Sequence, residues 1–298
     1  MERIFVLLRS PGSATAVLLG ATLIALIVAN SPLATQYMSL VNLKLGPLTT
    51  MEWVNDALMA IFFLFVGLEV KRELVSGELN TNAKRIMPGI AALFGVLVPA
   101  IIYYLMAGFS EVYIHGWAIP TATDIAFAIG VITALGSRVP NSMKVFLTAL
   151  AVIDDLIAII VIAIFYAAHL NLFYLFGAVV VTGLLIYCNR SGYVRSLSYI
   201  ILGIILWYCI LRSGLHATMA GVILAMTIPE RGKIGRKYVR PMQHWEHYLS
   251  NWVSFVIVPI FAFFNAGVSL GGFGVADLTH PVVLGVALAL ILGKEMGM

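Results

Sequence analysis

The sequence predicts an all-α polytopic membrane protein. Hydrophobic residues make up 61% of the 298-residue chain and charged residues 11%, well below the roughly 25% charged content of soluble domains. The apolar residues recur in long runs along the whole chain, which suits helices of about 20 residues crossing a hydrocarbon core of roughly 30 Å. Because lipid offers no partners to backbone N–H and C=O groups, these segments are expected to be helices. We therefore expect a single transmembrane domain over residues 1–298.

Hydropathy divides the chain into about ten candidate spans. In chain order they are residues 12–30, 54–75, 87–108, 117–136, 142–168, 172–188, 196–212, 214–229, 246–270 and 281–298. No small-residue cleavage pattern closes the first run and further spans follow it, so we interpret it as a helix and not as a secretory signal. The segments 196–212 and 214–229 are short and nearly contiguous.

The basic residues indicate how these spans are oriented. A net charge of +4 would suggest nucleic acid as a partner of a soluble protein, but here the basic residues lie in short loops between spans. With the N-terminus in the cytoplasm, nearly all of the 18 Lys and Arg residues fall on the inner side, and the outer loops receive Lys44 and Arg212. This asymmetry follows the positive-inside rule and supports the number of spans. No nucleic-acid partner is expected.

Adjacent carboxylates, Asp154 and Asp155, lie inside an apolar span. At about 1.5 Å rise per residue, Asp154 is about 15 Å from Lys144 at the inner end of its helix, which places the pair near the bilayer midplane. A charge at that depth costs about 2.5–3.5 kcal/mol, so such a residue is expected to have a partner, a proton or a cavity. Neighbouring helix positions diverge by about 100°, so the two side chains face different surroundings. Carboxylate oxygens suit hard cations, and we predict a Na⁺ or Li⁺ and proton site; hydrogen bonding between protonated acids is the alternative.

Two further ionisable residues lie at membrane depth. Asp124 follows Pro120, Thr121 and Thr123, a combination typical of an interrupted helix, with a simple proline kink as the alternative. Lys294 lies about 21 Å along its span from His280. It could neutralise a buried aspartate, compete with a cation for it, or extend toward the interface.

Other titratable residues lie near the predicted membrane boundaries. Glu69 and Glu73 are four apart on one helix face, and Glu246-His247 approach the same inner boundary. These residues could sense protons or could form a solvated charged rim. His216, which follows Ser213-Gly214 near the outer face, is more often a hydrogen-bonded boundary residue than a gate.

Several strings of the chain closely resemble the NhaA family of sodium/proton antiporters. They are Asn55-Asp56-Ala57-Leu58-Met59, Gly67-Leu68-Glu69-Val70-Lys71-Arg72-Glu73-Leu74, Thr123-Asp124-Ile125-Ala126-Phe127-Ala128, Ala149 through Asp154-Asp155-Leu156, Ser213-Gly214-Leu215-His216-Ala217-Thr218 and Pro259-Ile260-Phe261-Ala262-Phe263-Phe264-Asn265-Ala266-Gly267-Val268. The match runs collinearly from the first span to Gly293-Lys294. The resemblance implies the fold of that family, an inverted repeat with interrupted helices, which is a known transporter architecture.

The resemblance implies a role for each candidate site residue. It implies that Asp154 and Asp155 carry the cation and the protons, that Thr123 and Asp124 belong to a broken helix beside them, and that Lys294 pairs with Asp154. It associates a set of boundary residues with pH sensing: Glu69, Glu73, Glu246, His247 and His216. The implied activity is electrogenic, pH-regulated exchange of internal Na⁺ or Li⁺ for external protons in a bacterial inner membrane, with no cofactor and with a homodimer as a further expectation.

Two departures from the family pattern affect this expectation. Ser250 stands where some members carry a further histidine. Family members continue for two more spans after the lysine helix, whereas this chain stops at Met298, so we expect a C-terminally incomplete domain.

Three other classes of protein remain as alternatives. A retinal protein would use a membrane lysine with aspartate counterions, although about ten spans argue against the usual seven. An intramembrane aspartyl protease needs facing aspartates from two helices, whereas Asp154 and Asp155 are adjacent. A truncated, transport-incompetent membrane protein is the third.

Overall fold

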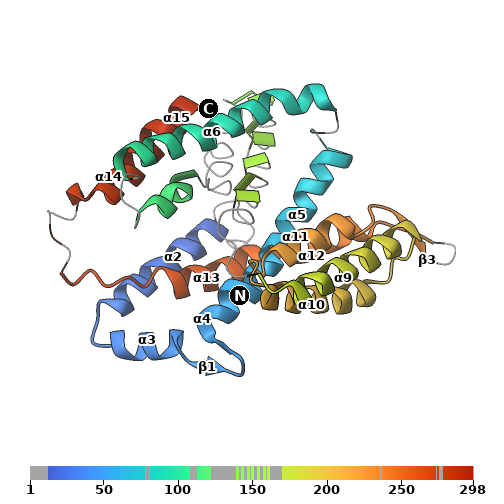
Figure 1. Ribbon diagram of the computed structural model, residues 1–298, viewed down its shortest axis with the longest axis horizontal. Coiled ribbons are helices and arrows are strands. Elements are labelled where there is room, and N and C mark those ends of the chain that lie inside the picture. The colour runs from blue at the N-terminus through green and yellow to red at the C-terminus, as the bar shows by residue number, and fades with distance from the viewer. Residues whose placement is uncertain are drawn as a thin grey trace. The chain divides into compact units, whose positions relative to one another are not determined.

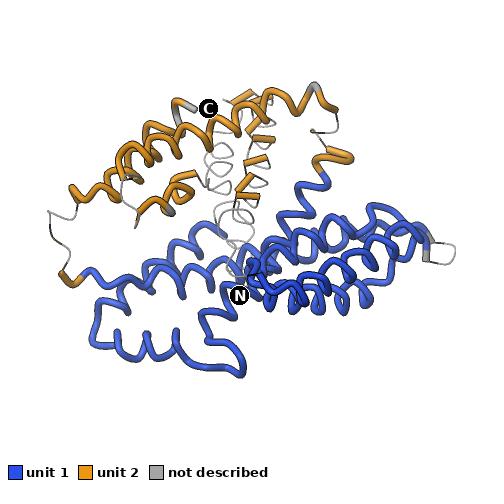
Figure 2. The backbone as a smooth tube through the Cα atoms, viewed as in Figure 1, with its two compact units in different colours: residues 1–72, 165–270 blue, residues 73–164, 271–298 orange. Residues whose placement is uncertain are grey.

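A computed structural model of the chain describes most of its residues. The described residues are 13–77, 79, 81–107, 113–121, 139–140, 142–143, 146–147, 149–150, 153–154, 157–158, 160–161, 170–234, 237–272, 274 and 278–297. The chain divides into two compact units (Figure 2). Unit 1 comprises Met1–Arg72 and Phe165–Leu270, and unit 2 comprises Glu73–Ile164 and Gly271–Met298.

The predicted all-α polytopic fold is confirmed. Among the described residues, five helices are long and apolar enough to cross a membrane: Thr50–Val75, Lys84–Ala107, Leu172–Arg190, Ser196–Ser213 and Pro241–Asn265. Two further helices, Ser13–Ala29 and Ala34–Val41, meet the same criteria as a pair bent by 118°, and Pro281–Gly293 is a shorter apolar helix.

The first part of unit 1 begins with a helical corner and a hairpin (Figure 1). Its elements are α2 (Ser13–Ala29), α3 (Ala34–Val41), β1 (Lys44–Leu45), β2 (Leu48–Thr49), α4 (Thr50–Glu52), η1 (Trp53–Leu58) and α5 (Met59–Val75), whose last residues belong to unit 2. Thr49 starts the long helix with a capping box, in which its side chain accepts from the Glu52 N–H and the Glu52 carboxylate accepts from the Thr49 N–H. The box satisfies donors that a helix N-terminus leaves open. The turn that follows, η1, is π-helical.

The second part of unit 1 contains antiparallel helices and a second hairpin. Its elements are α9 (Leu172–Arg190), α10 (Ser196–Ser213), α11 (Met219–Thr227), β3 (Gly232–Ile234), β4 (Lys237–Val239), α12 (Pro241–Trp252), η4 (Val253–Ile257) and α13 (Val258–Asn265). Gly214, at φ 88°, adopts the left-handed conformation that ends α10. The helix predicted at 214–229 therefore begins later, at Met219. The core between these helices and α5 includes Leu68, Leu185 and Leu206, all fully buried.

Unit 2 is built around a long helix, α6 (Asn82–Ala107), which packs against a continuous helical stretch (Figure 1). That stretch consists of α14 (Pro281–Leu288), the π-helical turn η6 (Ala289–Gly293) and α15 (Lys294–Gly297). A 3₁₀ helix, η2 (Ile114–Thr121), also packs on α6. At Gly293 the two helices approach so closely that an added Cβ would lie 2.8 Å from the Cα of Pro99. This contact fixes the position of the next residue, Lys294.

Candidate functional site

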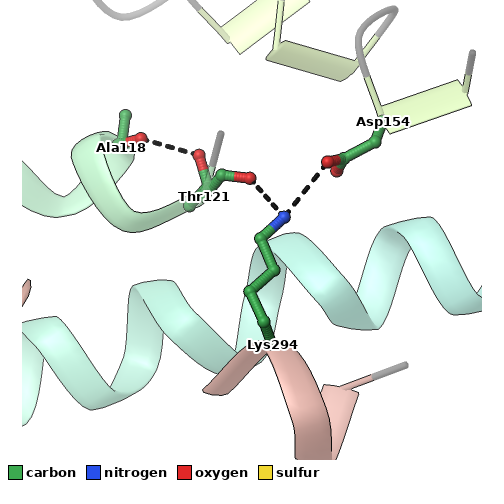
Figure 3. A network of polar contacts seen from close by, with 4 residues as sticks. All are labelled: Ala118, Thr121, Asp154 and Lys294. Carbon is green, nitrogen blue, oxygen red and sulfur yellow. Dashed lines mark hydrogen bonds and ion pairs between the residues drawn. The ribbon is translucent and has the colours of Figure 1, made fainter. Parts of the chain in front are cut away.

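A buried ion pair lies inside unit 2 (Figure 3). The Lys294 ammonium is 3.1 Å from the Asp154 carboxylate and donates a second hydrogen bond, of 2.6 Å, to the carbonyl oxygen of Thr121. The side chain of Asp154 is 3% exposed and that of Lys294 is 13% exposed. The three residues are far apart in the sequence, and the fold of unit 2 brings them together.

Local structure explains why these groups can meet. Lys294 directly follows the π-helical turn η6, and Gly293 lets its helix come against Pro99. Thr121 is the last residue of η2, where Pro120 has no N–H, and its own hydroxyl donates to Ala118 O at 2.7 Å. The carbonyl at a helix end has no helical partner, so it can accept a hydrogen bond from the lysine.

Burial sets the energetics of the pair. Removing two charges from water costs several kcal/mol per ion, and their mutual attraction and added hydrogen bonds must offset that cost. Asp154 and Lys294 together carry no net charge, whereas either one alone would leave a buried charge. A proton or a cation that arrived at the carboxylate would therefore change the net charge of the pair.

Three of the predicted ion-site residues lie outside the described residues. They are Thr123, Asp124 and Asp155. Their roles, like the roles of Asp154 and Lys294 in transport, stay predictions.

The predicted pH-sensing residues occupy different environments. Glu246 on α12 is 8% exposed and forms an ion pair with Arg72 of α5, while the next residue, His247, is exposed. Glu69 is half-buried on α5, and Glu73 is 8% exposed. Within unit 1, the structure brings Glu246 to Arg72 and does not bring His216 to them.

His216 lies at the opposite end of α11. This residue is exposed and precedes the N-terminus of α11, whereas the C-terminal carbonyls of α11 accept hydrogen bonds from Lys71, the neighbour of Arg72. The predicted sensing residues of unit 1 therefore form two separate groups.

Several polar contacts between the helices of unit 1 were not predicted from the sequence. Lys71 donates to the carbonyl oxygens of Ala225, Met226 and Ile228 at the end of α11. In the same unit, the Asn265 amide donates to the Asn55 side chain at 2.9 Å. Asn265 ends the apolar helix α13, and that signal could have indicated that it has a polar partner.

The π-helical turn η1 carries another unpredicted contact. Trp207 of α10 donates from its indole nitrogen to the carbonyl oxygen of Asp56 at 3.0 Å. Asp56 lies in η1, half-buried. No regular sequence pattern marks a π-helical turn, which commonly occurs at functional sites.

The fold and the ion pair together define a polytopic helical membrane protein with a charged site inside one of its units. Comparison with known proteins identifies its family: the family described as "Na+/H+ antiporter 1" matches residues 6–298, and the chain belongs to it. The family predicted from the sequence strings is confirmed. It is a family of transporters and not of enzymes.

Curated relatives from bacteria match nearly the whole chain. The Na(+)/H(+) antiporter NhaA of Mesorhizobium japonicum is 52% identical over 284 residues, which cover 94% of this chain and 71% of the relative. The antiporter of the same name from Rhizobium etli is 49% identical, with 97% of this chain and 75% of the relative covered. The one from Caulobacter vibrioides is 50% identical, with 98% and 71% covered. Together with the apolar helices, these matches indicate a multi-pass protein of a bacterial membrane.

Proposed function

We propose that the protein is a secondary active antiporter that exports Na⁺ in exchange for protons by alternating access. Residues 1–298 act in this proposal as a single transmembrane antiporter domain in the inner membrane, with the N-terminus in the cytoplasm. Membership of the antiporter family supports exchange of sodium and protons. Li⁺ is expected as a second transported cation, a homodimer as the assembled form, and no cofactor is required.

The observation that carries the proposed mechanism is the buried contact of Lys294 with Asp154. We propose that Asp154 and Asp155 carry the transported ions, with Asp124 and Thr123 contributing to the same site. A carboxylate oxygen can bond to a proton, a Na⁺ ion or an ammonium group, and these partners compete for it. Lys294 holds Asp154 when no cation is bound, and a Na⁺ ion that takes the carboxylate must displace the ammonium from it.

The exchange is proposed to be electrogenic and to depend on pH. If the site releases more protons than it takes up cations, each cycle moves net charge across the membrane. Glu69, Glu73, Glu246, His247 and His216 are the proposed pH-sensing residues. The ion pair of the buried Glu246 with Arg72 supports a role for this carboxylate, because protonation of Glu246 would break the pair.

Everted vesicles that contain the protein test the exchange. Respiration acidifies the vesicle interior, and added Na⁺ is expected to discharge the pH gradient, which a pH-sensitive fluorescent dye reports. Asp154→Asn and Asp155→Asn are each expected to abolish this discharge, because an amide cannot exchange a proton for a cation.

Glu230→Gln is the matched control. Glu230 pairs with the exposed Arg231 at 3.4 Å, away from the buried pair in sequence and outside unit 2, so this variant should retain the discharge. Vesicles in which the unaltered protein gives no Na⁺-dependent discharge would refute the proposed function. Retained discharge in Asp155→Asn would refute the role of that residue.

A further inference from the structure

The helix that carries Lys294 begins at a histidine that caps it. His280 is the N-cap residue of α14, with φ −61° and ψ 133°, and Pro281 follows at the first helical position. The imidazole Nδ1 accepts a hydrogen bond of 3.4 Å from the N–H of Val282, and the His280 carbonyl accepts the first helical bond, of 3.0 Å, from Leu284. A side-chain acceptor at this position satisfies a donor that the helix leaves open.

The cap requires one protonation state of the ring. A nitrogen that accepts a hydrogen bond carries no proton, so Nδ1 is bare and the neutral ring holds its proton on Nε2. Nε2 lies 3.3 Å from the Tyr113 hydroxyl and donates to it in this tautomer. The two rings also meet edge to face, with centroids 5.2 Å apart. When the ring takes up a second proton, both nitrogens become donors and the bond from Val282 is lost.

The surroundings of His280 hold it in this orientation. Tyr113, its partner, accepts a 2.8 Å hydrogen bond at its carbonyl from the hydroxyl of Tyr103 on α6. Tyr103 is 1% exposed and packs against Gly285 of α14. On α6 the charged residues, Lys84 and Arg85, stand at the opposite end of the helix.

The capped turn is continuous with the ion pair. From Pro281 to Gly297 the chain is helical, and Lys294 lies about 21 Å along it from His280. Contacts at Gly285 and Gly293 pin this helix against α6. A change at its first turn therefore acts on the segment that positions Lys294.

We propose that His280 is a proton-sensitive cap and a positioning residue for the Lys294 helix. With a neutral ring the helix is capped and Lys294 is held against Asp154; a second proton on the ring removes the cap and loosens the helix. In this way the proton concentration at the His280 end of α14 acts on the ion pair. The effect of the cap on transport rests on the proposed function, whereas its effect on the helix does not. The test of the cap therefore measures the stability of the protein.

Thermal unfolding of the purified protein in detergent, measured at pH 8 and pH 5.5, tests the cap. The Nδ1 atom can accept the Val282 hydrogen bond only while it carries no proton, so the unaltered protein should be less stable at pH 5.5 than at pH 8. Asparagine is a good N-cap residue that does not titrate, so His280→Asn should show a loss smaller by about 2–4 °C. His280→Ala should have the lower Tm already at pH 8, by a similar amount.

Further variants separate this cap from other titrating groups. The sequence places Glu111, His115 and Asp277 near the same elements, so His115→Asn and Asp277→Asn serve as comparisons. Both should retain the pH-dependent loss of the unaltered protein. If His280→Asn retains it in full, or if His115→Asn or Asp277→Asn removes it instead, the cap is overturned.

A double-mutant comparison tests the link to the ion pair. In a Lys294→Met background, the Tm change caused by His280→Ala should fall to half or less, because the helix no longer positions an ion pair. Equal changes in both backgrounds would overturn the positioning role. Vesicles provide a separate readout: His280→Asn should keep exchange down to a lower pH than the unaltered protein does. Absence of exchange in every variant would contradict the proposed function and leave the outcome of the melts unaffected.

Discussion

At the scale of single residues, the strongest constraint in unit 2 is the charge balance between Asp154 and Lys294. Both side chains are nearly inaccessible, so neither charge is relieved by solvent. The cost of one buried charge without the other exceeds the benefit of the pair itself. The effect of a substitution therefore depends on which charge remains.

Lys294→Met should destabilise the protein by about 3–5 kcal/mol, because it leaves the Asp154 carboxylate without its cation. The double variant Asp154→Asn with Lys294→Met should recover most of this loss, since no charge is left behind. Denaturant unfolding in detergent micelles measures both. Lys233→Met, which removes an exposed lysine of the β3–β4 hairpin, is the control and should change stability little. Additive effects of the two substitutions in unit 2 would contradict the coupling.

How much of the site the sequence predicts depends on the kind of signal. Asp154 and Lys294 are identifiable because a charge in an apolar run is costly wherever it lies. The Thr121 carbonyl and the His280 cap are not, because a backbone group has no sequence signature and a lone histidine at a helix boundary has many ordinary uses. For Thr123, Asp124 and Asp155, which lie outside the described residues, the sequence remains the source of the assignment.

At the scale of elements, α5 and α11 form a close seam within unit 1. An added Cβ on Gly67 would lie 2.7 Å from Ala225 Cβ, and one on Gly221 would meet the Ala60 carbonyl oxygen. Helices in a membrane associate through such small residues, which let their backbones come together. The short helix α11 therefore depends on its neighbour for its position.

Gly221→Ala should destabilise the protein by about 1–3 kcal/mol, because the new methyl group must displace the backbone of α5. The matched control is Gly183→Ala on α9, where no atom lies within 4 Å of the added Cβ. This control should be neutral or stabilising by about 0.5–1 kcal/mol, since alanine favours the helix. Thermal unfolding compares the two variants. Equal Tm values for both would contradict the close contact between Gly221 and the backbone of α5.

The C-terminal end of α11 depends on Lys71. Its ammonium donates hydrogen bonds to three carbonyl oxygens that have no N–H donor within the helix, and the bond to Met226 is 2.7 Å long. Lys71→Met should therefore loosen the last turn of α11, with a loss of about 1–3 kcal/mol for the stranded acceptors. Hydrogen–deuterium exchange should show faster exchange in the segment that covers Met219–Ile228. Lys71→Arg keeps a hydrogen-bond donor and should raise the exchange rate of this segment less. Equal exchange rates in the two variants would show that packing, and not the hydrogen bonds of Lys71, stabilises the last turn.

At the scale of the whole molecule, the arrangement of the chain across the membrane can be tested with the two hairpins of unit 1. The charge distribution predicts that β1–β2 lies outside and β3–β4 inside. In a chain with Cys188 and Cys209 replaced by alanine, Tyr238→Cys should react with an impermeant thiol reagent in everted vesicles, and Lys44→Cys in intact cells made permeable at the outer membrane. Both positions are exposed. Labelling of both from one side would contradict the predicted topology.

The fold follows from the sequence to different degrees in different parts. The bounds of helices such as Leu172–Arg190 and Ser196–Ser213 were predicted within a few residues. A long apolar run in lipid must satisfy its own backbone hydrogen bonds, and a helix does so. The hairpins were missed, since two- and three-residue strands leave little pattern. The helix predicted from residue 246 begins at Pro241, because its first turns are amphipathic and not uniformly apolar.

The hydrogen bond from Lys294 to the Thr121 carbonyl has one more consequence. An ammonium displaced from its carboxylate inside a membrane would ordinarily need water or a long retreat to the interface. In the exchange proposed above, the ammonium keeps the Thr121 carbonyl oxygen as a partner while the lysine side chain rotates away from Asp154. In that proposal the Thr121 carbonyl oxygen stabilises the ammonium while a proton or a cation occupies the Asp154 carboxylate.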